Sequence, residues 1–283
     1  MSISIPRRSF PTCMLAAVVW TTVASLGAEP DTPERIVALG DSITKGVRTG
    51  VAADEIFSHL VERRVQESHP KATVINEGIG GERTDQALAR LDNLLAKHRP
   101  TMMLVMYGTN DAYVDHGRTE PRLTREAYAA NLEAIIATLR AAKVTPILMT
   151  EPAWAQGAAP DGSGEHPDQR LGEYMEACRD VATRLDVPVV DHHAAWRTAA
   201  AAGQDLGEWT TDQCHPNPAG HTVMADTILK TLLDFGRRHN GDQSRHCAAR
   251  DLHTDILTPS LPRAARGGAT TPLRPPPQQT QSS

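Results

Sequence analysis

Short apolar, β-branched runs alternate along this chain with longer stretches of helical period, and this alternation restricts the possible folds more than any other feature. Strands are predicted at 36–39, 73–76, 102–107, 145–150 and 187–190. Helices are predicted at 55–68, 84–97, 125–142, 171–185 and 218–235. Strands that alternate with helices form βαβ units around a parallel sheet, and right-handed crossovers place helices on both of its faces. The sequence therefore predicts one α/β domain built on a five-stranded parallel sheet.

The two ends of the chain fall outside this alternation. Residues 1–28 combine an arginine pair in RRSF (7–10) with an apolar run at 14–23 and small residues, which is typical of a removable signal peptide. RRSF also resembles a twin-arginine signal, and a chance pair in an ordinary secretory signal is the alternative. Residues 241–283 bury too little apolar surface to order themselves, so we predict a disordered low-complexity tail. The enzyme domain is expected at 29–240.

The predicted signal also bears on where the protein acts. Its apolar run is shorter than the about 20 residues that span a bilayer, so we expect an exported protein, periplasmic or secreted, without stable membrane insertion of the mature chain. A net charge of −5 and scattered arginines give no basic stripe for nucleic acid, which we exclude as a partner.

Few cysteines are available for bridges. Only Cys178 and Cys214 lie in the predicted domain, so no disulfide framework follows, and whether these two pair stays open. Cys178 shares a predicted helix with Met175 and Tyr174, and all three fit the core.

The first predicted strand ends in VALGDSITKG (37–46), a junction that could hold a phosphate or present a nucleophilic serine. A Walker loop reads GxxxxGK before Ser or Thr, but here the lysine precedes the second glycine. The GIGG at 78–81 misses a dinucleotide fingerprint, because Arg83 replaces the third glycine. The GxSxG elbow is also absent, since Thr44 stands two residues after Ser42. A nucleophilic serine outside that elbow remains.

A nucleophilic Ser42 needs a base, a group that orients the base, and donors for the developing oxyanion. The motif DQCHPN places Asp212 three residues before His215 in one loop, so the carboxylate can orient the imidazole. At two other strand ends, Gly81 can offer an unshielded backbone N–H and Asn110 a side-chain amide. All of these groups lie where ligands bind in open α/β sheets, at the carboxyl ends of strands.

The blocks GDSIT, NEGIGG, GTND and DQCH occur in the order found in the SGNH (GDSL-type) hydrolases, and the chain resembles that family from about residue 35 to 235. The resemblance implies a flavodoxin-like three-layer α/β/α sandwich. It implies Ser42 as nucleophile, completed by Asp212 and His215 as a triad. It further implies an oxyanion hole formed by the backbone N–H of Ser42 with Gly81 and Asn110, and catalysis without a cofactor or metal.

Each of these residues also has a purely structural interpretation. Ser42 and Asp212 could cap helices, Asn110 could close an Asx turn, and Gly81 could serve a turn that needs positive φ. Four blocks in order at strand ends favour catalysis instead. His221 is a rival base, but it lies in the last predicted helix and has no carboxylate three residues before it.

Two further pairs of residues stand near predicted strand ends. His192 and His193 beside Asp191 suggest a metal, but neighbouring side chains on a strand point to opposite faces, so we expect solvated loop histidines and no metal. Trp154 and Trp209 are candidate substrate-binding residues at the mouth of the site. Each could stack on a sugar ring, or only anchor a loop through its apolar area.

These observations predict an exported serine esterase that hydrolyses short-chain esters, acetyl esters above all. Aromatic residues make up only 4% of the chain, and no long apolar run outside the signal provides a deep acyl tunnel. The polar segments 112–122 and 151–170 suit hydroxylated rings, so the expected partner is a small-molecule or polysaccharide ester, with carbohydrate favoured. Three alternatives remain: an acyltransferase with the same triad, a lysophospholipase or lipase-type acylhydrolase, and a catalytically silent carbohydrate-binding protein.

Overall fold

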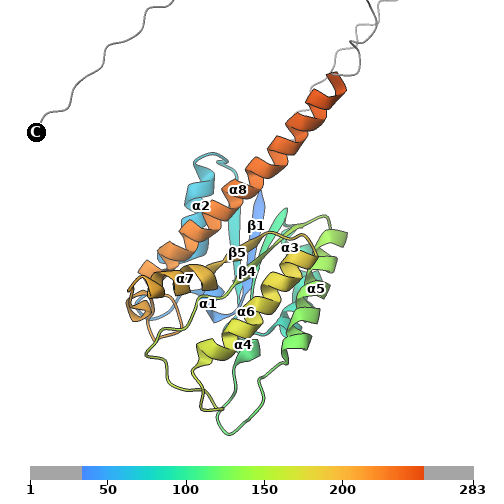
Figure 1. Cartoon of the computed structure of the whole chain (residues 1–283). Coiled ribbons are helices and arrows are strands. Elements are labelled where there is room, and N and C mark those ends of the chain that lie inside the picture. Colours follow the sequence, from blue (N-terminus) through green and yellow to red (C-terminus); the bar gives the residue numbers. More distant parts are fainter. Residues whose placement is uncertain (1–33, 252–283) are drawn as a thin grey trace, which may run out of the picture. The chain divides into compact units, whose positions relative to one another are not determined.

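A single parallel sheet organises the protein, in a computed structural model that describes residues 34–251 and the side chains of residues 34–235. The strand order is β2-β1-β3-β4-β5 (Figure 1). The strands are β1 (Arg35–Gly40), β2 (Thr73–Gly78), β3 (Met102–Met106), β4 (Thr145–Thr150) and β5 (Val189–Asp191). Strand β1 pairs in parallel with β2 on one side and with β3 on the other, so the strand order reverses at β1. The carboxyl ends of β1 and β3 therefore form a topological switch point, where ligands bind in open α/β sheets. The predicted flavodoxin-like α/β fold is confirmed.

Helices cover both faces of the sheet. Three of them, α3 (Thr84–His98), α5 (Arg125–Ala141) and α6 (Pro167–Arg184), pack on one face. The other face carries α1 (Ser42–Lys45), α2 (Phe57–Gln66), α7 (His192–Ala201) and the first turns of α8 (Pro218–Asp251). The remaining elements are short: α4 (Thr109–Ala112) and the 3₁₀ helices η1 (Ala53–Glu55) and η2 (Leu206–Trp209).

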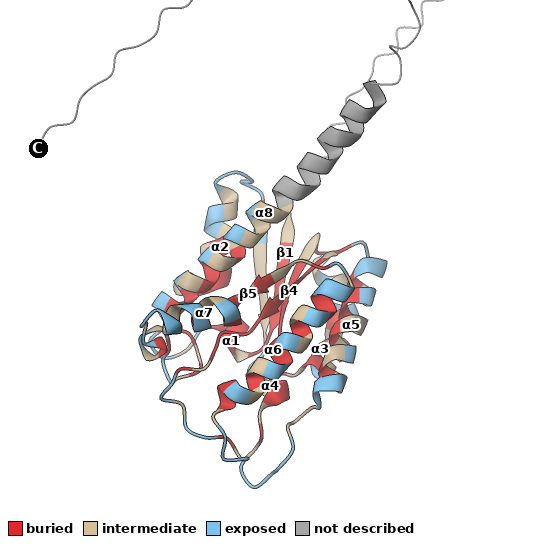
Figure 2. Cartoon of the chain, in the orientation of Figure 1, coloured by how far each residue is buried: buried red, intermediate tan, exposed pale blue. Residues whose placement is uncertain are grey.

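The central strands β1, β3 and β4 are buried on both faces, as expected when helices cover a parallel sheet, whereas the edge strand β2 is only partly buried (Figure 2). Successive side chains on a strand point to opposite faces, so Val37 and Leu39 pack under α3 and α5. Ile36 and Ala38 pack on the opposite side, under α2 and α8. This double burial explains why β1, β3 and β4 are continuous apolar runs in the sequence and do not alternate with polar residues.

Among the helices that were not predicted, α7 is the longest, and it corrects the expectation for two histidines. Helix α7 begins directly after β5 because the Asp191 side chain accepts a hydrogen bond from the Ala194 backbone N–H at 3.0 Å. His192 and His193 are therefore buried in the first turn of a helix and are not solvated loop residues. Burial lowers the pKa of His192 to about 3. His193 Nε2 lies 3.3 Å from an Asp168 carboxylate oxygen.

A metal site would need further ligands near His192 and His193 or at another place in the described residues. In the part of the chain that the structure describes, no group of three or more His, Cys, Asp or Glu side chains is arranged to hold a metal ion. The pair His192 and His193 therefore finds no third ligand there.

The C-terminal helix is longer than the predicted 218–235. Helix α8 continues to Asp251, so the segment from 241 predicted as disordered begins inside it; its Gln, Arg and Ala residues are good helix formers. The rest of that tail, at 252–283, and the predicted signal at 1–28 lie outside the described residues. Among the helices described, none has the length and apolar character needed to cross a membrane.

The core predictions for α6 are confirmed. Tyr174, Met175 and Cys178 are buried in the cluster between the sheet and α5. Cys178 and Cys214 are both free thiols and both buried, so they do not form a disulfide.

Candidate active site

Ser42 stands where β1 turns into α1, at the carboxyl edge of the sheet. A Cβ at Gly40 would lie 2.1 Å from Thr44 Oγ1, so only glycine fits this close turn. The Asp41 carboxylate caps α1 by accepting a hydrogen bond from the Ile43 backbone N–H at 2.8 Å. The cap is thus Asp41, and the Ser42 side chain remains available for another partner.

That partner is His215, which the structure brings next to Ser42 across 173 residues of sequence. Ser42 Oγ lies 2.8 Å from His215 Nε2, and His215 Nδ1 lies 2.9 Å from Asp212 Oδ2. The other Asp212 oxygen accepts hydrogen bonds from the backbone N–H groups of Cys214 (3.2 Å) and His215 (2.8 Å). An ionised carboxylate only accepts, so the proton belongs on Nδ1, and Nε2 is left as the acceptor for the serine hydroxyl.

The charges around His215 favour its neutral form. Burial lowers the pKa of His215, and the Arg48 guanidinium lowers it further, while the Asp212 carboxylate acts in the opposite direction. Arg48 Nη1 donates a hydrogen bond to Asp212 Oδ2 at 3.0 Å. Burial would raise the pKa of Asp212, but the hydrogen bond from the His215 backbone and the charge of that ring lower it. A neutral imidazole beside an ionised carboxylate can accept a proton from Ser42.

Asn110 lies at the start of α4, directly after β3, with both ends of its amide fixed. Asn110 Nδ2 donates to Asp41 Oδ2 at 2.7 Å, and Arg122 Nη1 donates to Asn110 Oδ1 at 2.9 Å. Arg122 in turn donates to the Asp115 carboxylate at 2.7 Å and lies 5.1 Å from the centre of the Tyr113 ring. An amide nitrogen carries two hydrogens, so one N–H of Asn110 remains for a ligand.

Gly81 belongs to a turn that passes beside Ser42. Its φ of 79° lies in the left-handed region, which supports the predicted need for glycine. A Cβ at Gly81 would meet no atom within 4 Å, and one at Gly80 would lie 3.9 Å from Ser42 Cβ. The turn is thus close to Ser42, and the space beside Gly81 is open.

Three buried carboxyl groups beneath the site were not predicted. Asp41, Asp111 and Glu151 are each fully buried. Burial raises the pKa of Asp41 to about 7 and that of Asp111 to about 6, and it raises that of Glu151 well above its ordinary value. Asp111 accepts hydrogen bonds from the Thr84 backbone and hydroxyl, whereas neither Glu151 oxygen has a partner in the described chain. Their sequence signal was present, because Asp41 and Glu151 each directly follow a strand.

The two candidate tryptophans differ in their surroundings. Trp154 is half-buried, stacks on Tyr113 with 6.2 Å between ring centres, and lines a surface pocket. Trp209 packs edge-on against the buried Trp196 at 5.2 Å. The position of Trp209 fits a loop anchor, and that of Trp154 leaves a ligand contact open.

His221, the rival base, is fully buried in α8 with its ring 6.1 Å from that of Phe57. Neither of its nitrogens has a hydrogen-bond partner in the described residues. No carboxylate orients it, so His215 is the better base.

The chain is similar to enzymes that act on esters. The family model described as GDSL-like Lipase/Acylhydrolase matches residues 38–223. A protein named thioesterase 1/protease 1/lysophospholipase L1 of Escherichia coli (strain K12) is 32% identical over 201 residues, which are 70% of this chain and 83% of that protein. An acetylxylan esterase of Geobacillus stearothermophilus is 24% identical over 212 residues, 70% of this chain and 94% of that protein.

The structure is similar to solved members of the same group. The crystal structure of a lipase/acylhydrolase from Enterococcus faecalis matches with a TM-score of 0.57 and 25% identity, covering 70% of this chain and 95% of that one. The family match at 38–223 contains the end of β1, the strands β2 to β5 and every predicted site residue. The chain therefore belongs to the GDSL-like lipase/acylhydrolase family and is a carboxylic ester hydrolase.

Proposed function

We propose that this protein is an exported serine esterase that removes acetyl groups from a carbohydrate. The observation that carries the proposal is the continuous hydrogen-bonded series from Ser42 Oγ through the His215 ring to Asp212. This series supplies a nucleophile, a base and the group that orients the base, which acyl transfer requires.

The first half of the reaction forms an acyl-enzyme. Ser42 Oγ attacks the ester carbonyl carbon while its proton passes to His215 Nε2, and Asp212 stabilises the resulting imidazolium. The carbonyl oxygen becomes negative and accepts hydrogen bonds from the backbone N–H groups of Ser42 and Gly81 and from Asn110 Nδ2. When the tetrahedral intermediate collapses, the carbon–oxygen bond to the alcohol breaks and the alcohol takes the proton from His215.

The second half restores the enzyme. A water molecule attacks the acyl carbon as His215 accepts its proton, and collapse of this intermediate returns the proton to Ser42 Oγ and releases the carboxylic acid. No step requires a metal ion or an organic cofactor.

An acetylated sugar is the favoured substrate for two reasons. The acetylxylan esterase relative acts, by its name, on an acetylated polysaccharide, and 151–170 near the site is polar and carries Trp154. The lysophospholipase in the name of the Escherichia coli relative keeps a long-chain acylhydrolase as the second candidate. An acyltransferase would use the same triad with a sugar hydroxyl in place of water.

Export of the enzyme rests on the sequence of its first 28 residues. Their arginine pair, apolar run and small residues fit a signal peptide, so we propose that the mature enzyme begins near residue 29. Its domain would then span 29–240.

The substrate proposal is tested with a series of esters from acetyl to octanoyl and with acetylated xylo-oligosaccharides. We expect kcat/KM to fall steeply from acetyl to octanoyl, and Trp154→Ala to impair sugar esters more than aryl acetates, with Trp154→Phe as the control that keeps a ring. A profile that peaks at eight carbons or more would instead indicate a lipase or lysophospholipase. Product analysis with and without an acceptor sugar separates hydrolysis from transfer.

A further inference from the structure

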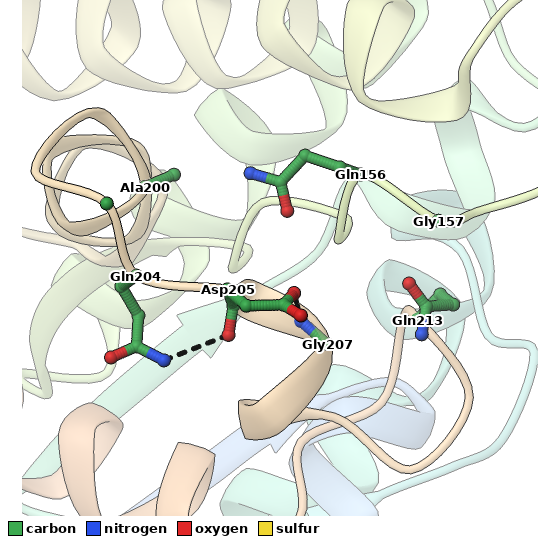
Figure 3. Close-up of a pocket in the computed structure, with 8 residues that line it drawn as sticks. Gln156, Gly157, Ala200, Gln204, Asp205, Gly207 and Gln213 are labelled. Atoms are coloured by element: carbon green, nitrogen blue, oxygen red, sulfur yellow. Dashed lines mark hydrogen bonds between the residues drawn. The ribbon is translucent and has the colours of Figure 1, made fainter.

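Two adjoining surface pockets extend from the catalytic loop along α7. The first has a volume of about 630 Å³ and is lined in part by Gln156, Gln204, Asp205 and Gln213 (Figure 3). The second, of about 510 Å³, shares Gln156 with the first and continues to Trp154. We call the two together the α7 groove. Gln213 of the loop between Asp212 and His215 lines the first pocket, and the Trp154 ring lines the second.

The loop that carries the triad residues also forms one wall of the α7 groove. Gln213 lies between Asp212 and His215 and lines the groove, and its φ of 71° is uncommon for a residue other than glycine. Its backbone C=O accepts a hydrogen bond from the Ala155 N–H at 2.8 Å, which ties the wall to the segment after β4. A Cβ at Gly157 would lie 2.5 Å from Gln213 Oε1, so the glycine leaves room for the amide.

The groove lies close enough to Ser42 for one substrate to reach both. Consecutive α-carbons are 3.8 Å apart, so those of Gln213 and His215 are separated by at most about 7.6 Å. His215 in turn contacts Ser42. A ligand chain whose ester lies at Ser42 therefore has its neighbouring units within reach of the Gln213 amide.

Two neutral amides of the groove are available to a ligand. The side chains of Gln156 and Gln213 make no hydrogen bond with any described residue. The charged groups each have one protein partner already, because Arg197 Nη1 donates to Asp168 at 2.9 Å and Asp205 Oδ1 accepts from the Gly207 N–H at 2.8 Å. A primary amide both donates and accepts, which matches a hydroxyl group and gives no preference for a charged ligand.

We propose that the α7 groove binds the sugar units next to the acetylated one, with Gln213 and Gln156 bonded to ring hydroxyls and Trp154 contacting a sugar ring in the second pocket. This inference rests on the proposed carbohydrate esterase function and assigns residues to its alcohol side. A lipid chain would cover both amides without offering either a hydrogen-bond partner, which makes it the poorer occupant.

The test compares two substrates in the full enzyme and in three single variants. Acetylated xylo-oligosaccharide serves as the sugar ester and phenyl acetate as the small ester, and the readout is the ratio of their kcat/KM values. Gln213→Ala and Gln156→Ala should each lower this ratio three- to ten-fold through KM, the loss expected for one neutral hydrogen bond. Gln169→Ala, which removes an exposed glutamine that lines neither pocket, is the matched control and should not change the ratio.

The possible outcomes separate the groove from the proposed function. An unchanged ratio in Gln213→Ala and Gln156→Ala, with the sugar ester still hydrolysed, overturns the groove alone. A wild-type enzyme that cleaves phenyl acetate but no sugar ester overturns the carbohydrate function and the groove with it. Because Gln213 adjoins the triad, Gln156→Ala decides the outcome if Gln213→Ala slows both esters equally. Equal slowing in both variants also counts against the groove, since a sugar contact cannot affect phenyl acetate.

Discussion

The proposed acid–base half of this site, Asp212 and His215, and its proposed oxyanion half, which includes Asn110, are held in different ways. Asp212 and His215 are three residues apart and bonded to each other through both backbone and ring, in a loop where Asp212 keeps 47% of its side chain exposed. Asn110 is instead held by groups 69 and 12 residues away in sequence, the fully buried Asp41 and the partly buried Arg122. The first half is a local sequence motif, and the second depends on residues that the fold brings together from separate parts of the chain.

Substitutions in the two halves should therefore differ in their effects on activity and on stability. A change in the loop removes chemistry but leaves the core intact, because few buried groups depend on it. A change at Asn110 also removes a hydrogen bond from Asp41, whose carboxyl group is buried. Activity and stability should therefore separate in the first half and fall together in the second.

The largest effect is expected in the acid–base half. Asp212→Asn should lower kcat by about 10⁴-fold, because an amide no longer holds His215 in the tautomer that accepts the serine proton. The melting temperature should change little, since the residue is half exposed. Steady-state kinetics and thermal unfolding measure both, with Asp54→Asn on the exposed η1 helix as the control. A variant that keeps kcat within tenfold would refute the role of Asp212.

The next effect sharpens the contrast with the oxyanion half. Asn110→Ala should reduce kcat by about a hundred- to a thousand-fold, the loss typical of one preorganised donor. It should also cost about 1–3 kcal/mol of unfolding free energy, because Asp41 loses a buried partner. If KM rises while kcat holds, Asn110 binds the ground state and is not an oxyanion donor.

A smaller effect is expected from the arginine that fixes the Asn110 amide. Arg122→Gln should lower kcat about tenfold with KM nearly unchanged, since the guanidinium both orients the amide and polarises its N–H toward the oxyanion. Arg118→Gln changes an exposed arginine in the same segment and serves as the matched control. A change confined to KM, or to melting temperature, would make Arg122 a purely structural residue.

The smallest effect is a displacement along the pH axis. Only neutral His215 accepts the serine proton, so kcat/KM should rise with pH through a pKa below the ordinary histidine value of 6.5. Arg48 lowers that pKa, so Arg48→Gln should move the rising limb to higher pH, whereas Arg63→Gln, at an exposed position of α2, should not. A limb that stays in place in Arg48→Gln, or moves to lower pH, would contradict this account of the charges.

The sequence predicted the parts of the fold that depend on continuous burial. All five strands and the longer helices were located because apolar runs and helical periods mark them directly. Helix α7 was missed because its alanine-rich segment has no clear apolar stripe, and only the packing of His192, His193 and Trp196 reveals it as a covering helix. Those histidines were placed in solvent for the same reason.

In the candidate site, residues marked by a local sequence pattern could likewise be predicted, and residues brought in by the fold could not. The pairing of Asp212 with His215 could be predicted from their spacing, and Ser42 could be singled out by its position at a strand end. Their catalytic roles remain predictions. Arg122 could not be found, since it lies in a stretch without regular structure and reaches Asn110 only through the folded loop. The buried Glu151 was overlooked although it directly follows a strand, because its position in the sequence does not show that its carboxyl group is buried.

The central claim is that Ser42 is the nucleophile, and covalent labelling tests it most directly. The folded enzyme would be treated with a fluorophosphonate, which reacts with activated serine hydroxyls, and the modified residue identified by peptide mass spectrometry. We expect one label on Ser42, none in Ser42→Ala, and strongly slowed labelling in Asp212→Asn. A label on another serine, or near-native turnover by correctly folded Ser42→Ala, would contradict the account.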